Sequence, residues 1–459
     1  MFTLTFYGGA QTVTGSKHLV TLDNGKKVLL DCGMFQGKGN NDNYNRDFGF
    51  DASSINYLIL SHAHIDHTGL VPRLVKQGFS GQIFCTPPTA ELAALILKDS
   101  ANIQNNEVDA IHDKRKEPLY QAQDVDQALN LLKTIPYNSS YEIDENLEVL
   151  FTDAGHILGS AVVNLTIKTK HRKKHLCFSG DIGRFDNRIL NSPQPFPAAD
   201  YIICESTYGD KLHDSLQNSE DKLKELIIET CITKKGKLLI PAFSIGRTQE
   251  LIYSLNVLAE DGRLPDIPVF VDSPLAVYAT DILKNNDENF NPAMKEYLKF
   301  DTDPFGFKNL HYITDKEESI LIKELNEPCV IISSSGMMEG GRIRHHLKTC
   351  IQDPKNTILV TGYCEPSTLG GQISRGDKEV NIFGETHEVK ADVQFLKEYS
   401  AHGDYGDMLK FLHCQDKEML KYIFLVHGEI RVMEKFKNSL QKEGYQNIEI
   451  PGYMVSYSL

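Results

Sequence analysis

Four side chains that can bind a metal ion lie within six residues of one another: His62, His64, Asp66 and His67. They directly follow the apolar run Tyr57-Leu58-Ile59-Leu60, which is typical of a short strand. A loop at the end of a strand lets imidazole and carboxylate groups converge from different directions. These groups suit zinc, and also iron or manganese. With 16 histidines in 459 residues, such clustering by chance is improbable, so the sequence predicts a metal site here.

One loop cannot complete two coordination shells, and further candidate ligands follow other apolar runs. His156, Asp181 and His427 each come shortly after a run that resembles a strand. Any one of them alone would more often be an ordinary loop residue. Together they repeat one plan, a strand followed by His or Asp. We therefore expect them to belong to the same site.

This order of motifs, HxHxDH followed by a lone His and then by Gly-Asp, resembles the metallo-β-lactamase fold. The resemblance implies an αββα sandwich with a dinuclear metal site at one edge of its sheets. Asp31, at the end of Val28-Leu29-Leu30-Asp31, matches the first motif of that family. It is expected to orient the loop histidines by hydrogen bonding.

The same resemblance implies two zinc ions per chain, with manganese as the alternative metal. The implied ligands are His62, His64 and His156 for one metal, Asp66, His67 and His427 for the other, and Asp181 as the bridge between them. The sequence alone leaves open which imidazole binds which metal.

A long insertion follows Asp181. Residues 209–387 alternate runs that resemble strands with runs that resemble helices, which predicts a parallel sheet flanked by helices in an α/β protein. This arrangement resembles the β-CASP subfamily, named for nucleases of RNA processing and DNA repair. We therefore expect a metallo-β-lactamase domain made of residues 1–208 and 388–459, with a β-CASP domain at 209–387.

The landmarks of the β-CASP subfamily are an acidic residue at a strand end, a histidine in Ser-Ala-His and a last histidine. Glu205, His402 and His427 match them in that order. Members that act on RNA resemble this chain in having His at the last position, whereas relatives that act on DNA typically have an apolar residue there. The resemblance therefore implies a ribonuclease.

The implied reaction is hydrolysis of RNA phosphodiester bonds, in RNA processing or decay, by a hydroxide that two metal ions activate. Asp66 and Asp181 take part as ligands. His402 is the candidate general acid, and Glu205 would keep it protonated and oriented. We expect 5′-phosphate and 3′-hydroxyl products and endonucleolytic cutting, with 5′-exonuclease action as the alternative. An insertion lying over the metals would form an interdomain cleft that prefers single-stranded RNA.

We expect the substrate to contact one arginine and three small residues within or just after the insertion. Arg247 lies at the start of a predicted helix, where a phosphate would be favoured. Ser335 and Gly336 belong to a second segment of the same plan, and Ser400 opens the Ser-Ala-His motif. The glycines of both segments equally fit tight strand-to-helix turns without any ligand.

The net charge of −14 argues against attraction of the whole surface to nucleic acid or anionic lipid. It leaves room for a nucleic-acid enzyme, because bound metal ions reverse the field inside a site. No apolar run approaches the ~20 residues of a membrane span, and the N-terminus does not resemble a secretory signal. Nine cysteines without a CxxC motif favour the reducing cytoplasm. A homodimer is compatible with the family.

Three other functions compete with that of a ribonuclease. A small-molecule hydrolase of the same fold is disfavoured by the insertion and by the pair of Glu205 and His402. A DNA nuclease is disfavoured by His427. A non-catalytic scaffold is disfavoured because every ligand position is filled. The sequence does not reveal which RNA is cut.

Overall fold

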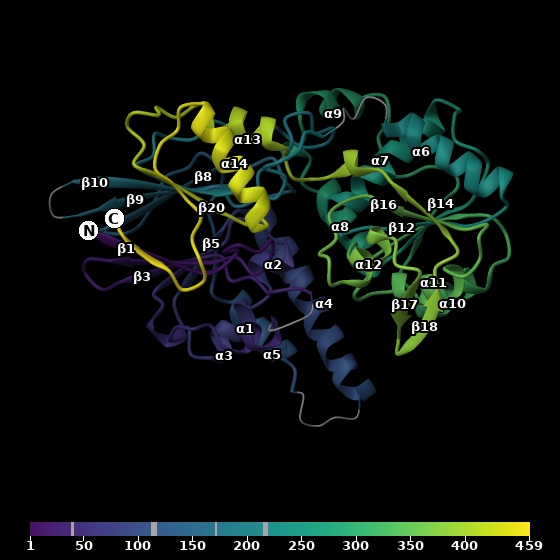
Figure 1. The fold of residues 1–459 in the computed structure, drawn as a ribbon, viewed down its shortest axis with the longest axis horizontal. Coiled ribbons are helices and arrows are strands. Elements are labelled where there is room, and N and C mark those ends of the chain that lie inside the picture. The colour runs from purple at the N-terminus through teal and green to yellow at the C-terminus, as the bar shows by residue number, and fades with distance from the viewer. Residues whose placement is uncertain (38–40, 112–116, 170–171, 214–218) are drawn as a thin grey trace. The chain divides into compact units, whose positions relative to one another are not determined.

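The structure is a computed structural model that describes residues 1–37, 41–111, 117–169, 172–213 and 219–459. It divides into two compact units (Figure 1): unit 1 comprises Met1–Leu212 and His402–Leu459, and unit 2 comprises His213–Ala401. Residues 388–401, which we expected in the first domain, belong to unit 2. The reason is that β19 (Asp392–Phe395) pairs in parallel with β16 (Thr357–Val360) of that unit.

The first sheet of unit 1 combines a meander with a parallel half. In spatial order its strands are β22 (Ser456–Ser458), β1 (Phe2–Gly8), β2 (Lys17–Leu22), β3 (Lys27–Leu30), β4 (Tyr57–Ile59), β5 (Gln82–Cys85) and β6 (Leu132–Thr134). Neighbours from β22 to β3 are antiparallel, and neighbours from β3 to β6 are parallel. In the antiparallel half, β1, β2 and β3 follow one another in the sequence, whereas β22 comes from the C-terminal part of the chain.

The second sheet of unit 1 is completed by the C-terminal part of the chain. In spatial order its strands are β21 (Ile448–Glu449), β20 (Tyr422–Val426), β11 (Tyr201–Glu205), β10 (Lys173–Phe178), β9 (Ala161–Lys168), β8 (Leu147–Asp153) and β7 (Tyr141–Asp144). Strands β10, β11, β20 and β21 run parallel to one another. Strands β7 to β10 pair antiparallel.

Three apolar cores make unit 1 a four-layer sandwich. Side chains of both sheets, among them Phe6, Phe151 and Phe178, fill the space between them. Helices cover the outer face of the first sheet through a second core, and α13 and α14 cover the second sheet through a third. Burial of each large apolar side chain contributes about 1.5–3 kcal/mol. The helices are α1 (Asn41–Arg46), α2 (Ile65–Thr68), α3 (Val71–Lys76), α4 (Pro87–Ile111), α5 (Ala122–Leu129), α13 (Tyr405–Leu412) and α14 (Ile430–Lys442).

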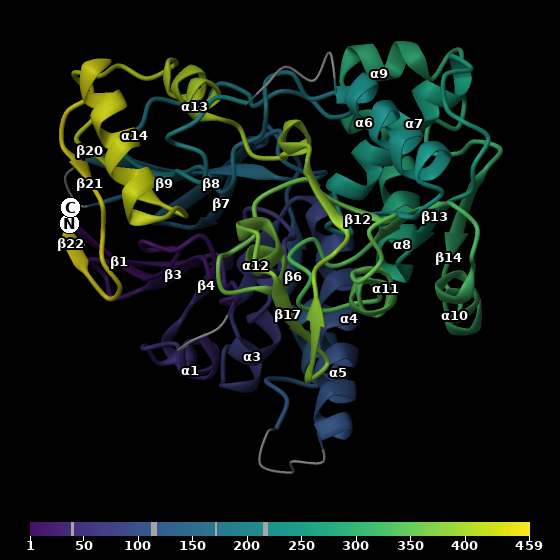
Figure 2. The same ribbon diagram turned by 45° about the vertical axis from the view of Figure 1, so that its right-hand side comes forward.

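Unit 2 is built around a six-stranded sheet whose neighbouring strands are all parallel. Part of this sheet is seen in Figure 2. In spatial order its strands are β14 (Leu310–Ile313), β13 (Val269–Asp272), β15 (Val330–Ser333), β12 (Leu238–Pro241), β16 and β19. Parallel strands need crossover connections, and helices supply most of them. The helices are α6 (Ser219–Ile227), α7 (Arg247–Glu260), α8 (Pro274–Lys284), α9 (Pro292–Tyr297), α10 (Lys316–Glu324), α11 (Ile343–Cys350) and α12 (Leu369–Arg375), and β17 (Glu379–Ile382) and β18 (Glu385–Glu388) form a hairpin.

The strand directions in unit 1 explain why polar side chains meet at one edge of the sandwich. The carboxyl ends of β10, β11 and β20 lie next to one another and lead to Asp181, Glu205 and His427. In the other sheet, the carboxyl ends of β3 and β4 lead to Asp31 and His62. Chain segments that are far apart in sequence therefore deliver functional groups to one place.

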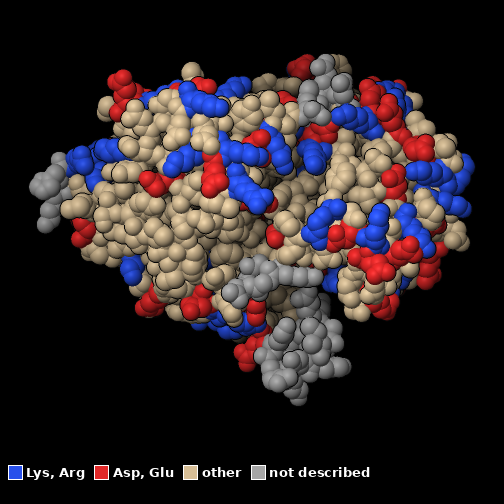
Figure 3. All heavy atoms as spheres, in the orientation of Figure 1, with Lys and Arg blue, Asp and Glu red and all other residues tan. Residues whose placement is uncertain are grey.

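None of the helices within the described ranges has the length and apolar character needed to cross a membrane. On the face of the molecule drawn in Figure 3, lysine and arginine side chains lie among aspartates and glutamates. Acidic and basic side chains are therefore interspersed on this face, although the net charge of the chain is negative.

Candidate metal centre

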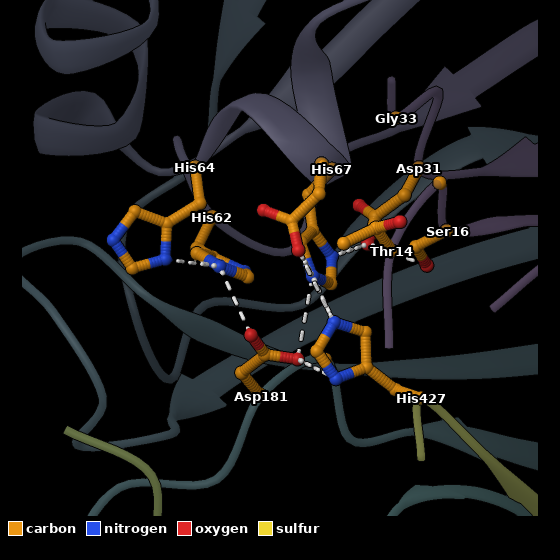
Figure 4. Close-up of polar contacts among 12 residues, drawn as sticks. Thr14, Ser16, Asp31, Gly33, His62, His64, His67, Asp181 and His427 are labelled. Atoms are coloured by element: carbon orange, nitrogen blue, oxygen red, sulfur yellow. Dashed lines mark hydrogen bonds and ion pairs between the residues drawn. The ribbon is translucent and has the colours of Figure 1, made fainter. Parts of the chain in front are cut away.

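Three imidazole nitrogens and one carboxylate oxygen of unit 1 form a first ligand set. Figure 4 labels three of its four residues, His62, His64 and Asp181. His62 Nε2 lies 3.1 Å from His64 Nδ1, which is 3.2 Å from His156 Nε2. Asp181 Oδ2 lies 3.4 Å from His62 Nε2 and 3.7 Å from His156 Nε2. The loop after β4 supplies two of these histidines, and the loop after β8 supplies the third. The four atoms surround one small volume.

A second ligand set lies on the other side of Asp181. His67 Nε2 is 3.3 Å from His427 Nε2 and 3.3 Å from Asp181 Oδ1. Asp66 Oδ2 is 3.3 Å from His427 Nε2 and 3.9 Å from His67 Nε2. Asp66 and His67 come from the single turn of α2, and His427 follows β20. The two oxygens of Asp181 thus face different ligand sets.

The spacing of these atoms fits a tetrahedral metal ion. Ligand atoms bonded to zinc at about 2.0–2.1 Å in a tetrahedron lie about 3.3 Å from one another. The closest contacts within both sets cluster around that spacing. In the first set, His64 Nδ1 also faces two other imidazole nitrogens at once, and a single proton on it can serve only one of them. A cation bound by the lone pairs of these nitrogens would remove the need for a shared proton. The residues present therefore fit the metal ions that the sequence predicts.

The surroundings of the first ligand set favour the protonation states that bind metal ions, whereas at His67 of the second set the carboxylates of Asp181, Asp31 and Asp66 outweigh burial and raise the pKa well above its usual value. Burial lowers the pKa of His62 well below its usual value and that of His64 to about 4. Burial alone would raise the pKa of Asp181, but the nearby imidazoles outweigh it and hold that pKa well below its ordinary range. Neutral imidazoles and an ionised carboxylate are the forms that coordinate a cation.

Asp31 orients two of the loop histidines. Its Oδ2 lies 2.6 Å from His67 Nδ1 and accepts a hydrogen bond from Ser61 Oγ at 2.8 Å, while its Oδ1 accepts one from the Ser61 amide at 2.7 Å. Because the Ser61 hydroxyl donates its proton to Asp31, its contact of 3.0 Å with His62 Nδ1 is one in which it accepts. Both imidazoles therefore carry their proton on Nδ1 and present Nε2 to the ligand sets.

Gly33 lets the chain pass directly against the turn that carries Asp66 and His67. The amides of Ser16 and Cys32 donate to the carbonyls of Asp66 and His67 at 2.9 and 2.8 Å. A Cβ atom on Gly33 would lie 1.6 Å from the Asp66 carbonyl oxygen. No flexible side chain is available to yield there, so only glycine fits.

Replacing Gly33 with alanine should therefore displace the α2 turn. We expect the free energy of unfolding to fall by about 1–3 kcal/mol, the usual cost of overpacking. Urea denaturation of the metal-free protein measures this change. Gly340→Ala is the matched control, because a Cβ there meets nothing within 4 Å. Equal stability of the two variants would contradict the prediction.

Glu205 and His402 form a carboxylate–imidazole pair beside the ligand sets. Glu205 Oε1 lies 3.2 Å from His402 Nδ1 and accepts a hydrogen bond from the Ile182 amide at 2.5 Å. His402 Nδ1 also lies 3.9 Å from Asp181 Oδ2. Burial alone would lower the pKa of His402, but the carboxylates of Glu205 and Asp181 outweigh it and raise that pKa. The surroundings thus favour a protonated imidazole close to the proposed metals.

The predicted substrate-contacting residues lie in unit 2. The Arg247 guanidinium is buried and donates to the Thr361 carbonyl, so it supports the backbone inside that unit. Gly336 lies against Phe243, to which a Cβ would come within 2.9 Å. Ser335 faces the backbone of residue 340, and Ser400 is 1% exposed. These contacts fit turn formation, and binding of RNA by the four residues stays a prediction.

Three family models match consecutive parts of the chain. A metallo-β-lactamase superfamily domain matches residues 19–195 and a Beta-Casp domain matches residues 248–373. A Zn-dependent metallo-hydrolase RNA specificity domain matches residues 386–451. The first and last matches cover the segments that supply the ligand sets, and the middle match lies within unit 2.

Relatives match almost the full length. A ribonuclease of Thermus thermophilus is 33% identical over 423 residues, which are 92% of each chain. An RNase J-like protein of Methanocaldococcus jannaschii is 32% identical over 432 residues, 94% of this chain and 93% of that protein. The chain belongs to the β-CASP family of metallo-β-lactamase-fold ribonucleases. The same β-CASP architecture relates it to the transcription termination factor FttA of Pyrococcus abyssi, at 31% identity over 93% of this chain and 66% of that protein.

Solved structures add a likeness of fold. A protein of unknown function from Enterococcus faecalis V583 aligns over the whole of both chains with a TM-score of 0.53 at 11% identity. Membership of the β-CASP family confirms the predicted fold, a metallo-β-lactamase αββα sandwich with an inserted β-CASP domain.

Proposed function

We propose that this β-CASP protein is a metal-dependent ribonuclease that hydrolyses phosphodiester bonds of RNA. The observation that carries the proposal is the pair of ligand sets divided by Asp181, with Glu205 and His402 beside them. The names of the relatives support RNA as the substrate, since two of them are called ribonuclease or RNase J-like. We further propose two zinc ions per chain, with manganese as the alternative.

The metal ions would supply an activated water near neutral pH and neutralise charge on the phosphate. The protein supplies the other elements of the reaction. Attack of water on phosphorus breaks the P–O3′ bond, which leaves a 5′-phosphate on one product and requires a proton at O3′ of the other. His402 is the group placed to donate that proton, and Glu205 orients it through Nδ1. Asp181 would contribute one carboxylate oxygen to each ligand set.

The direct test is cleavage of an RNA oligomer labelled in separate samples at its 5′ or 3′ end. Protein dialysed against a chelator should be inactive, and added zinc or manganese should restore cutting. Product sizes from the two labels distinguish internal cutting from stepwise removal of nucleotides from the 5′ end. The proposal fails if protein with two bound metal ions leaves the RNA intact.

Matched substrates address the alternative functions. A DNA oligomer of the same sequence should be cut more slowly than the RNA, and a thioester should not be hydrolysed. An unstructured RNA should be cut faster than a blunt duplex, as the expected preference for single strands requires. Faster action on DNA or on the thioester would favour the corresponding alternative.

A further inference from the structure

One imidazole of the second ligand set has its outer nitrogen in contact with a threonine hydroxyl. Thr207 Oγ1 lies 2.9 Å from His427 Nδ1 and 3.1 Å from the His427 carbonyl oxygen. Thr207 is 7% exposed and follows the end of β11 by two residues. No sequence motif singled it out, because an isolated threonine after a strand resembles an ordinary turn residue.

The hydroxyl has one proton, and its two contacts determine where that proton lies. A carbonyl oxygen only accepts, so Thr207 Oγ1 donates to the carbonyl of His427. The contact with His427 Nδ1 must then be one in which the hydroxyl accepts, and Nδ1 carries the proton. His427 Nε2 is left with its lone pair, directed towards Asp66 and His67. Asp181 Oδ1, at 3.7 Å from Nδ1, is beyond hydrogen-bonding distance.

The backbone around His427 is fixed by the same segment. His427 adopts a φ of 52°, in the left-handed region that few non-glycine residues occupy. Its amide donates to the Gly9 carbonyl at 2.6 Å, and the Ser206 amide donates to its carbonyl at 3.3 Å. Ser206 Oγ donates to the Val426 carbonyl at 2.7 Å. These contacts hold the backbone alongside the Thr207 hydroxyl, which bonds both the His427 carbonyl and the ring.

We propose that Thr207 is a positioning residue that sets the tautomer and ring orientation of His427 for the metal of the second ligand set. It does for His427 what Asp31 does for His67, although Thr207 contributes a neutral hydroxyl and Asp31 a carboxylate. This inference rests on the proposed function only in requiring that the second set binds a metal ion. It also predicts a selective effect, because Thr207 touches no ligand of the first set among the contacts described.

The test compares Thr207→Val, which removes the hydroxyl and keeps the shape, with Thr207→Ser, which keeps the hydroxyl. Zinc is titrated into metal-free protein in competition with a chromophoric chelator. The valine variant should bind one of the two zinc equivalents about 10–100-fold more weakly, the usual effect of losing a hydrogen bond to a metal-binding histidine. The other equivalent should bind as in the parent protein, and the serine variant should restore the weakened one.

Thr5→Val is the matched control. Thr5 is also a buried threonine of unit 1, and its hydroxyl lies 2.8 Å from Ser456 Oγ, away from both ligand sets. It should leave both zinc equivalents unchanged. Unaltered affinity for both zinc equivalents in Thr207→Val, or weakening of both equivalents alike, would overturn the inference. If the parent protein itself fails to bind a second zinc, the proposed dinuclear centre fails instead, so the two failures are separate results.

Discussion

Replacing Asp181 with alanine should remove both metal ions and slow RNA cleavage by at least about 10³-fold. The carboxylate is 2% exposed and places one oxygen in each ligand set. One substitution therefore removes a ligand from both sets at once. A metal ion contributes several kcal/mol of charge stabilisation in the transition state, and each 1.36 kcal/mol corresponds to a tenfold change in rate.

Elemental analysis gives the metal content of this variant, and the end-labelled RNA assay gives its rate. Asp126→Ala is the control, since Asp126 is an exposed residue of α5 in the same unit. Circular dichroism establishes that both variants are folded. An Asp181→Ala protein that retains two metal ions and cuts RNA at the parental rate would refute the bridging role.

Replacing His402 with alanine should reduce the rate by about 10²–10⁴-fold while both metal ions stay bound. The nearest partner of His402 Nδ1 is Glu205 at 3.2 Å, whereas Asp181 Oδ2 lies 3.9 Å away, so we expect its removal to leave the ligands of both sets in place. The loss should fall on kcat, because protonation of O3′ belongs to the chemical step and not to RNA binding.

A substrate with a better leaving group distinguishes proton donation from positioning. An aryl phosphodiester such as bis(4-nitrophenyl) phosphate expels a phenolate that needs little protonation. His402→Ala should therefore lose far less activity on that substrate than on RNA. His413→Ala, which alters an exposed histidine at the end of α13, should retain activity on both. An equal loss on the two substrates would show that His402 acts otherwise than as the acid.

Much of the secondary structure near the metal centre could be predicted from sequence because it is encoded locally. Apolar runs such as 57–60, 147–151 and 422–426 correspond to strands β4, β8 and β20. The assignment of residues 388–401 to the first domain could not succeed on the same basis. A four-residue strand such as β19 does not reveal its partner, and only its pairing with β16 places it in unit 2.

The candidate ligands could be predicted because several strand ends repeat the same plan, a histidine or aspartate after an apolar run, in an order that resembles a known family, although each residue alone resembles an ordinary loop residue. The residues whose hydrogen bonds orient these ligands could not be predicted from the sequence. Ser61 and Thr207 resemble ordinary loop residues, and Thr207 meets His427 across 220 residues of sequence. For Arg247 the sequence suggests a ligand contact, because an arginine at a helix start is typical of an anion site. In the structure its guanidinium donates to the Thr361 carbonyl. The role of such residues depends on their burial and on contacts with residues far away in the sequence.

The position of β20 also constrains how the protein matures. His67 and His427 are 360 residues apart, and all of unit 2 is translated between β11 and β20. At about 5–20 residues per second, a ribosome needs on the order of 20–70 s to pass from His67 to His427. During this time the nascent chain has Asp66 and His67 but lacks their partner. The second ligand set is therefore complete only after the inserted unit has been translated.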